Sequence, residues 1–151
     1  MHKLSILNSR EIKEIMKLIE SQWGAKLSPD YVFLKNSENR VFIVSRGIEK
    51  VDMDKLRINS IGMYFCEIDR KGIRLSIEGS QIVGPKAEKN IAEISEDQAR
   101  QWLRGEDLEV SGDYSGFAII KCNNDFLGNG KFKDGKILNY VNKGRRVSSI
   151  I

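Results

Sequence analysis

The sequence predicts an α+β protein with two domains, a small N-terminal α+β domain and a C-terminal β-barrel. In the N-terminal half, an amphipathic helix precedes two β-hairpins, which is typical of a helix packed on a sheet. At Gly84-Pro85 the pattern restarts, because proline disfavours helix in the residue before it. Beyond that point, short strands separated by turn tripeptides surround a single short helix. We therefore place the domains at residues 1–84 and 85–151.

The N-terminal helix is expected over residues 9–23. Its apolar side chains recur at helical spacing, which indicates one buried face. They are Ile12, Ile15, Met16, Ile19 and Trp23. Asn8 or Ser9 can cap the helix, Glu11 stands where a capping box needs it, and Gly24 is a typical helix end.

Two β-hairpins are expected after this helix. The first joins residues 31–35 to residues 40–44 through a four-residue polar loop. The second joins residues 61–68 to residues 73–77, and Gly72 in its turn can adopt a positive φ. One helix packed on these strands makes a small α+β unit.

The C-terminal domain is expected to be a small barrel. Residues 89–94 read as a strand, after which Ser95 caps a short helix with Gln98 as its capping-box partner and Gly105 as its end. Further strands are predicted at residues 108–110, 116–121, 125–132 and 136–141. Closing such short strands into a barrel would remove exposed sheet edges.

The composition narrows the function. No run of about 18 apolar residues occurs, and the N-terminus lacks the apolar core of a secretory signal, so we expect a complete cytoplasmic chain without membrane contact. Cys66 and Cys122 lie in apolar runs and are expected to be reduced core thiols. His2 is the one histidine, which leaves no base for a thiol enzyme and too few ligands for a zinc site.

The glycine-rich segment Leu127-Gly128-Asn129-Gly130-Lys131 does not fit a nucleotide-binding loop. No glycine stands five residues before Gly130, and Phe132 replaces the hydroxyl residue of a phosphate-binding loop. A strand follows the segment where a Rossmann fold would have a helix. With no other catalytic constellation in the sequence, we expect a protein that is not an enzyme and carries no metal or cofactor.

The charge is unevenly distributed. The chain has a formal net charge of +4, yet residues 86–115 carry four Lys or Arg against eight Asp or Glu. Residues 121–151 reverse this balance, with seven basic residues against two acidic ones. This basic end, mixed with glycine, asparagine and aromatic residues, indicates contact with phosphate groups. A solvated lysine-rich surface is the alternative.

Basic and aromatic side chains on a small barrel suit RNA, because cations neutralise phosphates while Tyr140 and arginine can stack on unpaired bases. The predicted phosphate contacts are Lys131, Lys133, Lys136, Lys143, Arg145 and Arg146, with Arg100 and Arg104 as additions on the short helix. Strand alternation separates Lys131 and Lys133 from Phe132, so outward lysines imply a core position for Phe132.

Three segments carry a resemblance to a known domain: Gln101-Trp-Leu-Arg-Gly-Glu-Asp-Leu108, Gly116-Phe-Ala-Ile-Ile120 and Leu127-Gly-Asn-Gly-Lys131. Together they resemble a PUA domain, an RNA-binding pseudo-barrel. The end of the chain, residues 127–147, is similar to the C-terminal PUA-like module of Sun-type RNA cytosine-5 methyltransferases, with Asn142 where that module usually has proline. The methyltransferase's cofactor loop and Pro-Cys nucleophile motif do not occur in this sequence, so the resemblance does not carry catalysis over.

The N-terminal segments Arg40-Val-Phe-Ile-Val-Ser45, Ser60-Ile-Gly-Met-Tyr-Phe65 and Ile73-Arg-Leu-Ser76 are similar in their order to the Nip-seven family. Members of that family pair a small α/β domain with a PUA domain and act in ribosome assembly. The resemblance implies binding to ribosomal or transfer RNA, with a ribosome-assembly or RNA-modifying protein as partner. The rival hypothesis is an adaptor whose N-terminal sheet docks an enzyme such as a methyltransferase, and a small enzyme is a third.

Overall fold

The computed structural model describes residues 4–28, 30–45, 62–70 and 72–141. These residues form helices and two separate five-stranded sheets, in agreement with the predicted α+β class. The first sheet has the order β1-β2-β3-β4-β5, with β1 (Ser5–Ile6), β2 (Tyr31–Lys35), β3 (Arg40–Ser45), β4 (Met63–Asp69) and β5 (Gly72–Leu75). The second has the order β6-β8-β9-β10-β7, with β6 (Ile91–Glu93), β7 (Leu108–Glu109), β8 (Phe117–Cys122), β9 (Asp125–Lys133) and β10 (Lys136–Leu138).

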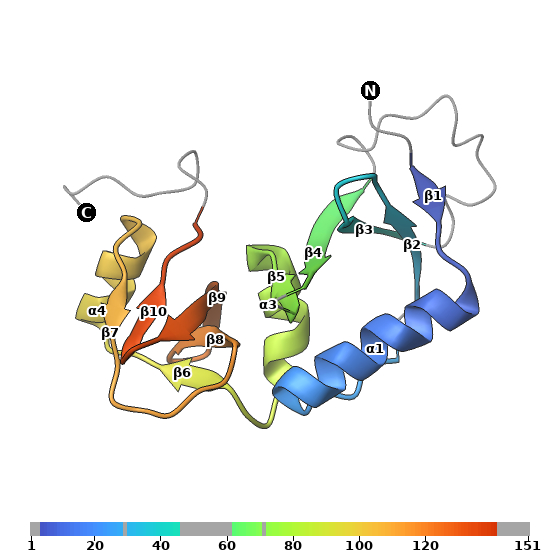
Figure 1. The fold of residues 1–151 in the computed structure, drawn as a ribbon. Coiled ribbons are helices and arrows are strands. Elements are labelled where there is room, and N and C mark those ends of the chain that lie inside the picture. Colours follow the sequence, from blue (N-terminus) through green and yellow to red (C-terminus); the bar gives the residue numbers. More distant parts are fainter. Residues whose placement is uncertain (1–3, 29, 46–61, 71, 142–151) are drawn as a thin grey trace.

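The molecule has two lobes (Figure 1). The first sheet and helix α1 (Ser9–Trp23) form one lobe, and the second sheet and helix α4 (Glu96–Leu103) form the other. Helix α3 (Ile77–Val83) lies between them and contacts both β4 and β9. Helix α3 therefore joins the two sheets, which also contact each other directly through β5, β8 and β9.

Helix α1 begins and ends as the sequence predicts. The Asn8 side chain accepts a hydrogen bond from the Glu11 backbone N–H at 2.9 Å, and the Glu11 carboxylate accepts one from the Asn8 N–H at 3.2 Å. Gly24 ends the helix in the left-handed region at φ 70°. The buried face consists of Ile15, Ile19 and Trp23, and burying each such side chain contributes about 1.5–3 kcal/mol.

The second hairpin differs from its prediction at its end. Strand β5 stops at Leu75 instead of continuing to residue 77, because the Ser76 hydroxyl caps α3 by accepting a hydrogen bond from the Gly79 N–H at 2.9 Å. A side chain at Gly79 would overlap the Phe65 carbonyl oxygen, so the glycine permits α3 to lie directly on β4. The sequence analysis did not predict this helix, because the apolar residues up to Ile77 indicated a strand there, although Ser76 is a local capping signal.

The predicted restart at Gly84-Pro85 is also corrected. Gly84 has helical backbone angles, φ −51° and ψ −47°, and the chain continues from α3 into the 3-10 helix η3 (Gly84–Lys86). Proline stands here at the start of η3, a position where its missing N–H is not needed. Gly84 is packed against the Phe126 ring of β9, which any side chain at residue 84 would overlap.

The second sheet contains the predicted strands without closing into a barrel. Strands β6 and β7 form its two edges among the described residues, so the arrangement is consistent with a PUA-like fold while the predicted closure is not present. Strand β6 pairs in parallel with β8, and the other pairs are antiparallel. Helix α4, capped by Ser95 and Gln98 as predicted, covers one face through the fully buried Trp102.

The core of the first sheet extends across the predicted domain boundary. Phe117 and Ile119 of β8 are buried in the same cluster as Trp23. The Trp23 indole N–H and the Gln22 side-chain amide both donate to the Phe117 carbonyl at 2.9 Å. The division at residue 84 stays a prediction from sequence, and these contacts join the segments on its two sides.

Cys66 and Cys122 are buried free thiols, as predicted. Burial raises the pKa of the Cys66 thiol, and the nearby Glu67 carboxylate adds to the rise, so this thiol stays protonated and unreactive. Within the described residues, no helix is long and apolar enough to cross a membrane, and no three His, Cys, Asp or Glu side chains are grouped as metal ligands.

Candidate nucleic-acid interface

Lys131 and Lys133 lie on the face of the second sheet that α4 does not cover. Lys131 is paired in register with Phe117, whose ring belongs to the core cluster of the first lobe, and register partners point to the same side of a sheet. Lys133 follows two positions later on the same strand and face. Among the residues described, no carboxylate forms an ion pair with either lysine.

The alternation predicted for this strand is confirmed. Phe132, between the two lysines, packs against the core cluster beneath α4, and its ring lies edge-on to that of Tyr114 with centroids 5.6 Å apart. Phe132 is therefore a packing residue.

Lys136 has a different environment from the other two lysines. It pairs in register with Lys133 on one side and with Glu109 on the other. It also lines a polar hollow together with Asp107 and Glu109. These carboxylates offset its positive charge, so Lys136 contributes less to an anion-binding surface than Lys131 or Lys133.

Arg100 and Arg104 lie on α4, on the opposite side of the second sheet from Lys131. Both already have carboxylate partners: Arg100 pairs with Asp97 at 3.3 Å, and Arg104 with Glu106 at 2.7 Å. The structure does not bring these arginines together with the lysines of β9.

The other three predicted contacts, Lys143, Arg145 and Arg146, lie outside the described residues. Their role in binding stays a prediction from the charge pattern.

Asn139 fixes the path of the chain just beyond β10. Its side-chain amide donates to the carbonyl oxygens of Trp102 at 2.8 Å and Glu106 at 2.9 Å. Its side-chain oxygen accepts from the Val141 N–H at 2.7 Å. Asp107 completes the arrangement by accepting from the Asn139 N–H at 2.7 Å. Four hydrogen bonds thus hold the backbone on both sides of the exposed Tyr140.

Tyr140 lies where the two lobes meet. The residue is 43% exposed, and its ring centroid lies 5.8 Å from that of Phe117. The Arg74 guanidinium, from β5 of the first sheet, lies 4.9 Å from the Tyr140 ring centroid. This distance is within the range of a cation–π contact. The stacked pair therefore takes one member from each side of the predicted domain boundary.

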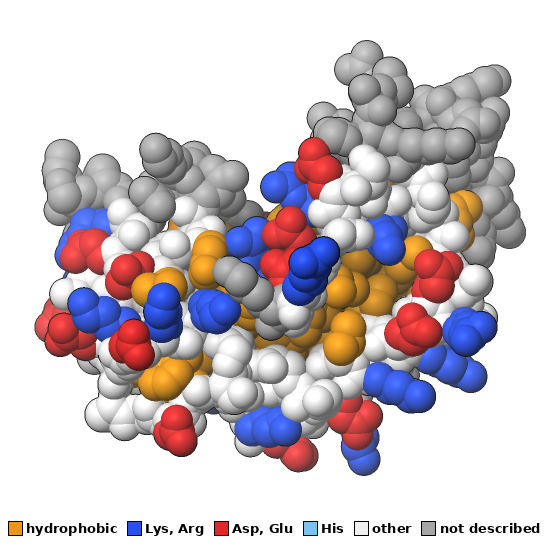
Figure 2. Space-filling model, viewed as in Figure 1, with side chains coloured by type: hydrophobic (Ala, Val, Ile, Leu, Met, Phe, Trp, Pro, Cys, Tyr) orange, Lys and Arg blue, Asp and Glu red, His pale blue; other side chains and the backbone are white. Residues whose placement is uncertain are grey.

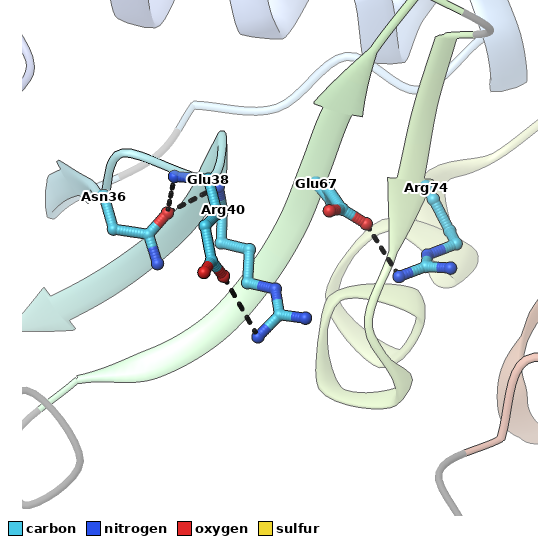
Figure 3. A network of polar contacts seen from close by, with 5 residues as sticks. All are labelled: Asn36, Glu38, Arg40, Glu67 and Arg74. Carbon is cyan, nitrogen blue, oxygen red and sulfur yellow. Dashed lines mark hydrogen bonds and ion pairs between the residues drawn. The ribbon is translucent and has the colours of Figure 1, made fainter. Parts of the chain in front are cut away.

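Arg74 is oriented by a carboxylate on the neighbouring strand. It donates to the Glu67 side chain at 2.7 Å, and both side chains are partly buried (Figure 3). Glu67 is the register partner of Arg74 on β5 and of Arg40 on β3, so the three form a row across the sheet with a carboxylate between two guanidinium groups. A charge-assisted bond of this kind restricts the arginine to one direction.

The turn before β3 holds Arg40 in that row. The Asn36 side-chain oxygen accepts hydrogen bonds from the backbone N–H groups of Glu38 at 2.9 Å and Arg40 at 3.0 Å (Figure 3). The Glu38 carboxylate lies 4.0 Å from the Arg40 guanidinium, at the limit of an ion pair. Arg40 in turn lies 5.8 Å from the centroid of the Tyr64 ring.

Tyr64 joins the two arginines. Burial raises the pKa of its hydroxyl, although a hydrogen bond with Arg74 opposes the rise. The hydroxyl therefore stays neutral at physiological pH. The Phe42 ring packs beside Tyr64 with centroids 5.7 Å apart. Guanidinium groups and aromatic rings thus alternate in the order Arg40, Tyr64, Arg74 and Tyr140, from β3 to the chain beyond β10.

The two glycines of β9 have structural roles. Gly128 has φ 127°, a conformation that side chains rarely adopt. A side chain at Gly130 would overlap the Leu138 carbonyl oxygen and approach Trp102 to 2.8 Å. Gly130 therefore allows β9 to lie close to both α4 and β10.

Sequence reasoning did not select Arg40, Tyr64 or Arg74. The signal that could have found them is alternation: Arg74 stands between Ile73 and Leu75, which are buried, so its side chain must lie on the other face of its strand. Their meeting with Tyr140 depends on how the two sheets pack, and no local pattern encodes that arrangement.

Comparison with known proteins supports the resemblance to the methyltransferase module. Residues 89–147 match the family described as the methyltransferase RsmF PUA domain. The chain is also 28% identical over 138 residues to ribosomal RNA small subunit methyltransferase F of Aeromonas salmonicida (strain A449), an alignment that covers 89% of this chain and 28% of the relative. The enzyme of the same name from Vibrio cholerae serotype O1 (strain M66-2) is 26% identical over 128 residues, covering 83% of this chain and 26% of the relative.

The chain thus spans a little over a quarter of the length of these curated relatives. The alignment with the Aeromonas protein is much longer than residues 89–147, so the similarity includes the N-terminal half. The similarity of that half to the Nip-seven family is not supported by these comparisons and stays an interpretation of the sequence.

Proposed function

We propose that this chain is a non-catalytic RNA-binding protein that holds RNA on the lysine-bearing face of its second sheet. One observation carries the proposal: Lys131 and Lys133 have no carboxylate ion pair among the described residues and share their face with Phe117, whose ring contacts Tyr140. Cations without carboxylate partners beside an exposed aromatic ring suit a flexible polyanion with unpaired bases.

Ribosomal RNA is the proposed target. The relatives are named as methyltransferases of small-subunit ribosomal RNA, and residues 89–147 match the PUA domain of that enzyme. A role in ribosome assembly or in RNA modification in the cytoplasm follows from this target. Transfer RNA is the alternative substrate within the same class.

The second candidate function is an adaptor that docks an RNA-modifying enzyme. A hollow of about 430 Å³ in the first lobe favours it, because its walls include the apolar side chains of Met16, Leu27, Phe33 and Ile82. Apolar side chains gather beside α3 in the space-filling view (Figure 2). Exposed apolar surface of this kind is typical of protein contacts.

The test compares two double variants that each remove two positive charges. Lys131→Gln with Lys133→Gln changes the proposed face, whereas Arg100→Gln with Arg104→Gln changes the opposite side of the same sheet. Affinity for a single-stranded ribosomal RNA fragment is measured for both at one moderate salt concentration. We expect the lysine variant to lose about tenfold, because phosphate contacts dominate such binding, and the arginine variant to lose little.

Equal losses in the two variants would move the interface away from β9. Unchanged RNA affinity in both, together with recovery of a protein partner by the wild type, would make the adaptor the better account. Circular dichroism of each variant shows whether a loss reflects binding or unfolding.

A further inference from the structure

We propose that the hollow between the two lobes is a pocket for one unpaired pyrimidine base of the bound RNA, with Tyr64 and Tyr140 as its aromatic walls. This inference rests on the proposed RNA-binding function and adds a base preference to it. The hollow is lined by residues from both sheets and from α3, so it exists only where the lobes meet.

The size of the hollow limits the ligand. Its volume is about 160 Å³, close to an engineered protein cavity of about 150 Å³ that binds benzene, a single six-membered ring. A pyrimidine has one such ring, whereas a purine has two fused rings. Within its walls the hollow has room for the single ring of uracil or cytosine, whereas the second ring of adenine or guanine would extend beyond them.

The walls have the chemistry that a base requires. Tyr140 is exposed and lines the hollow from the second lobe, while Tyr64 lines it from β4 of the first sheet, so aromatic groups are present for stacking. Arg74 contacts both rings and supplies hydrogen-bond donors that can reach the edge of a base. Because Glu67 holds Arg74 in place, this donor is oriented before the ligand arrives.

Two hydrogen bonds join β9 and β5, which form one wall of the hollow. Asn129 is 4% exposed, and with its amide turned to suit its neighbours it forms two hydrogen bonds with the backbone of Leu75, at 2.9 and 3.0 Å. These bonds tie β9 of the second sheet to β5 of the first. Gly128, beside Asn129, lines the hollow without a side chain. The two hydrogen bonds of Asn129 therefore fix the spacing of β9 and β5 at this wall of the pocket.

The position of the pocket fits a single strand. Both Lys131 and Tyr140 lie beside Phe117: Lys131 is its register partner on β9, and the Tyr140 ring contacts the Phe117 ring. A strand whose base enters the hollow thus has its phosphates near Lys131 and Lys133. Two independent interactions follow: the lysines attract the phosphates of any RNA, and the pocket favours a pyrimidine base.

The experiment measures the affinity of the full chain for labelled single strands of about ten nucleotides of uridine, cytidine or adenosine, a length within the range that single-strand binding sites cover. We expect uridine or cytidine to bind at least about fivefold more tightly than adenosine at one salt concentration. Tyr140→Ala should lower pyrimidine affinity about tenfold and leave adenosine affinity nearly unchanged, since stacking on one base is lost. Tyr140→Phe keeps the ring and should keep the preference.

The outcomes separate the pocket from the wider function. Equal affinity for the three strands, with binding still weakened by Lys131→Gln and Lys133→Gln, would overturn the pocket and leave RNA binding intact. No binding of any strand would overturn both. Free uridine monophosphate that competes as well as the strand would show a mononucleotide site and would also overturn the proposal.

A second measurement on the wild type avoids any effect of substitution on folding. A strand containing 4-thiouridine is crosslinked by light, and the modified peptide is mapped. Crosslinks to the segments containing Tyr64 or Tyr140 support the pocket. Crosslinks confined to α4 or α1 would contradict it.

Discussion

The two sheets present their positive charges in different ways. On the first sheet, Arg40 and Arg74 flank Glu67, and their guanidinium groups lie beside aromatic rings. On the second sheet, Lys131 and Lys133 form no carboxylate ion pair among the described residues. Arginines oriented by a carboxylate can form directional contacts with bases. Lysines without such partners attract phosphates whatever the base sequence. We infer from this difference that the first sheet selects the RNA and the second sheet attracts it.

The largest loss of stability is expected from a substitution at the contact between the first lobe and the second sheet. Trp23→Ala removes the side chain that packs against Phe117 and donates to its carbonyl, and Trp→Ala in a core costs about 3–5 kcal/mol. Urea unfolding followed by circular dichroism should show one transition at lower urea. A second transition that stays at the wild-type midpoint would show that the second sheet folds without the first lobe.

Removal of residues 1–84 applies the same reasoning to the whole first lobe. The deletion exposes Phe117 and Ile119 and removes α3 from β9. We expect the fragment 85–151 to unfold at a lower temperature than the full chain and to lose pyrimidine preference, since Tyr64 and Arg74 are gone. A stable fragment with full RNA affinity and preference would contradict the role given to the first sheet.

Gly130→Ala tests the packing under the lysine face. The added carbon would overlap the Leu138 carbonyl oxygen and crowd Trp102, and overpacking of this kind costs about 1–3 kcal/mol. The matched control is Ser111→Ala, an exposed loop position of the second lobe. Thermal unfolding should show a clear loss for Gly130→Ala and almost none for the control.

The sequence predicts features that depend on neighbouring residues better than features that depend on packing between distant segments. The caps of α1 and α4 and the hairpin turns were predicted correctly, because Asn8, Ser95 and Asn123 act through neighbours a few residues away. The lysine face followed from simple alternation. Helix α3 was missed because residues 73–77 were interpreted as a strand, although Ser76 caps the helix locally. The close contact of Gly79 with β4 depends on tertiary packing and has no local signal.

The candidate site shows the same limit. Tyr140 was predicted as a stacking residue because it lies among basic residues near the C-terminal end. Its partner Arg74 lies 66 positions earlier in the chain and contacts it only through the packing of the two sheets. The open second sheet was missed for a related reason, since the strand order β6-β8-β9-β10-β7 depends on a parallel pairing that short apolar runs do not specify.

A further prediction concerns the orientation of Arg74. Glu67→Gln removes the charge that holds the guanidinium, so Arg74 should stack less often on Tyr140. We expect pyrimidine affinity to fall about threefold, or about 0.65 kcal/mol, which is within the range of one ordinary hydrogen bond in a protein. The control is Glu38→Gln, whose carboxylate is 4.0 Å from Arg40, and which should change affinity little. A higher affinity in Glu67→Gln would show that the carboxylate only repels the RNA.

The smallest effect is a pH dependence of stability in alkaline solution. Burial raises the pKa of Tyr64 and of Cys66 in the folded state. The folded chain therefore keeps protons that the unfolded chain releases, so the contribution of these two groups to the free energy of unfolding should be constant below about pH 8 and fall as the pH rises beyond about 9. Tyr64→Phe should flatten some of this fall, and an identical profile in wild type and variant would contradict it.

The salt dependence of RNA affinity tests the central claim most directly. For single-stranded RNA, each neutralised phosphate contributes about −0.7 to the slope of log affinity against log salt. We predict that Lys131→Gln with Lys133→Gln makes the slope less steep by about 1.4, while Tyr140→Ala lowers affinity without changing the slope. A slope that is near zero in the wild type, or identical in the wild type and the lysine variant, would contradict RNA binding at this face.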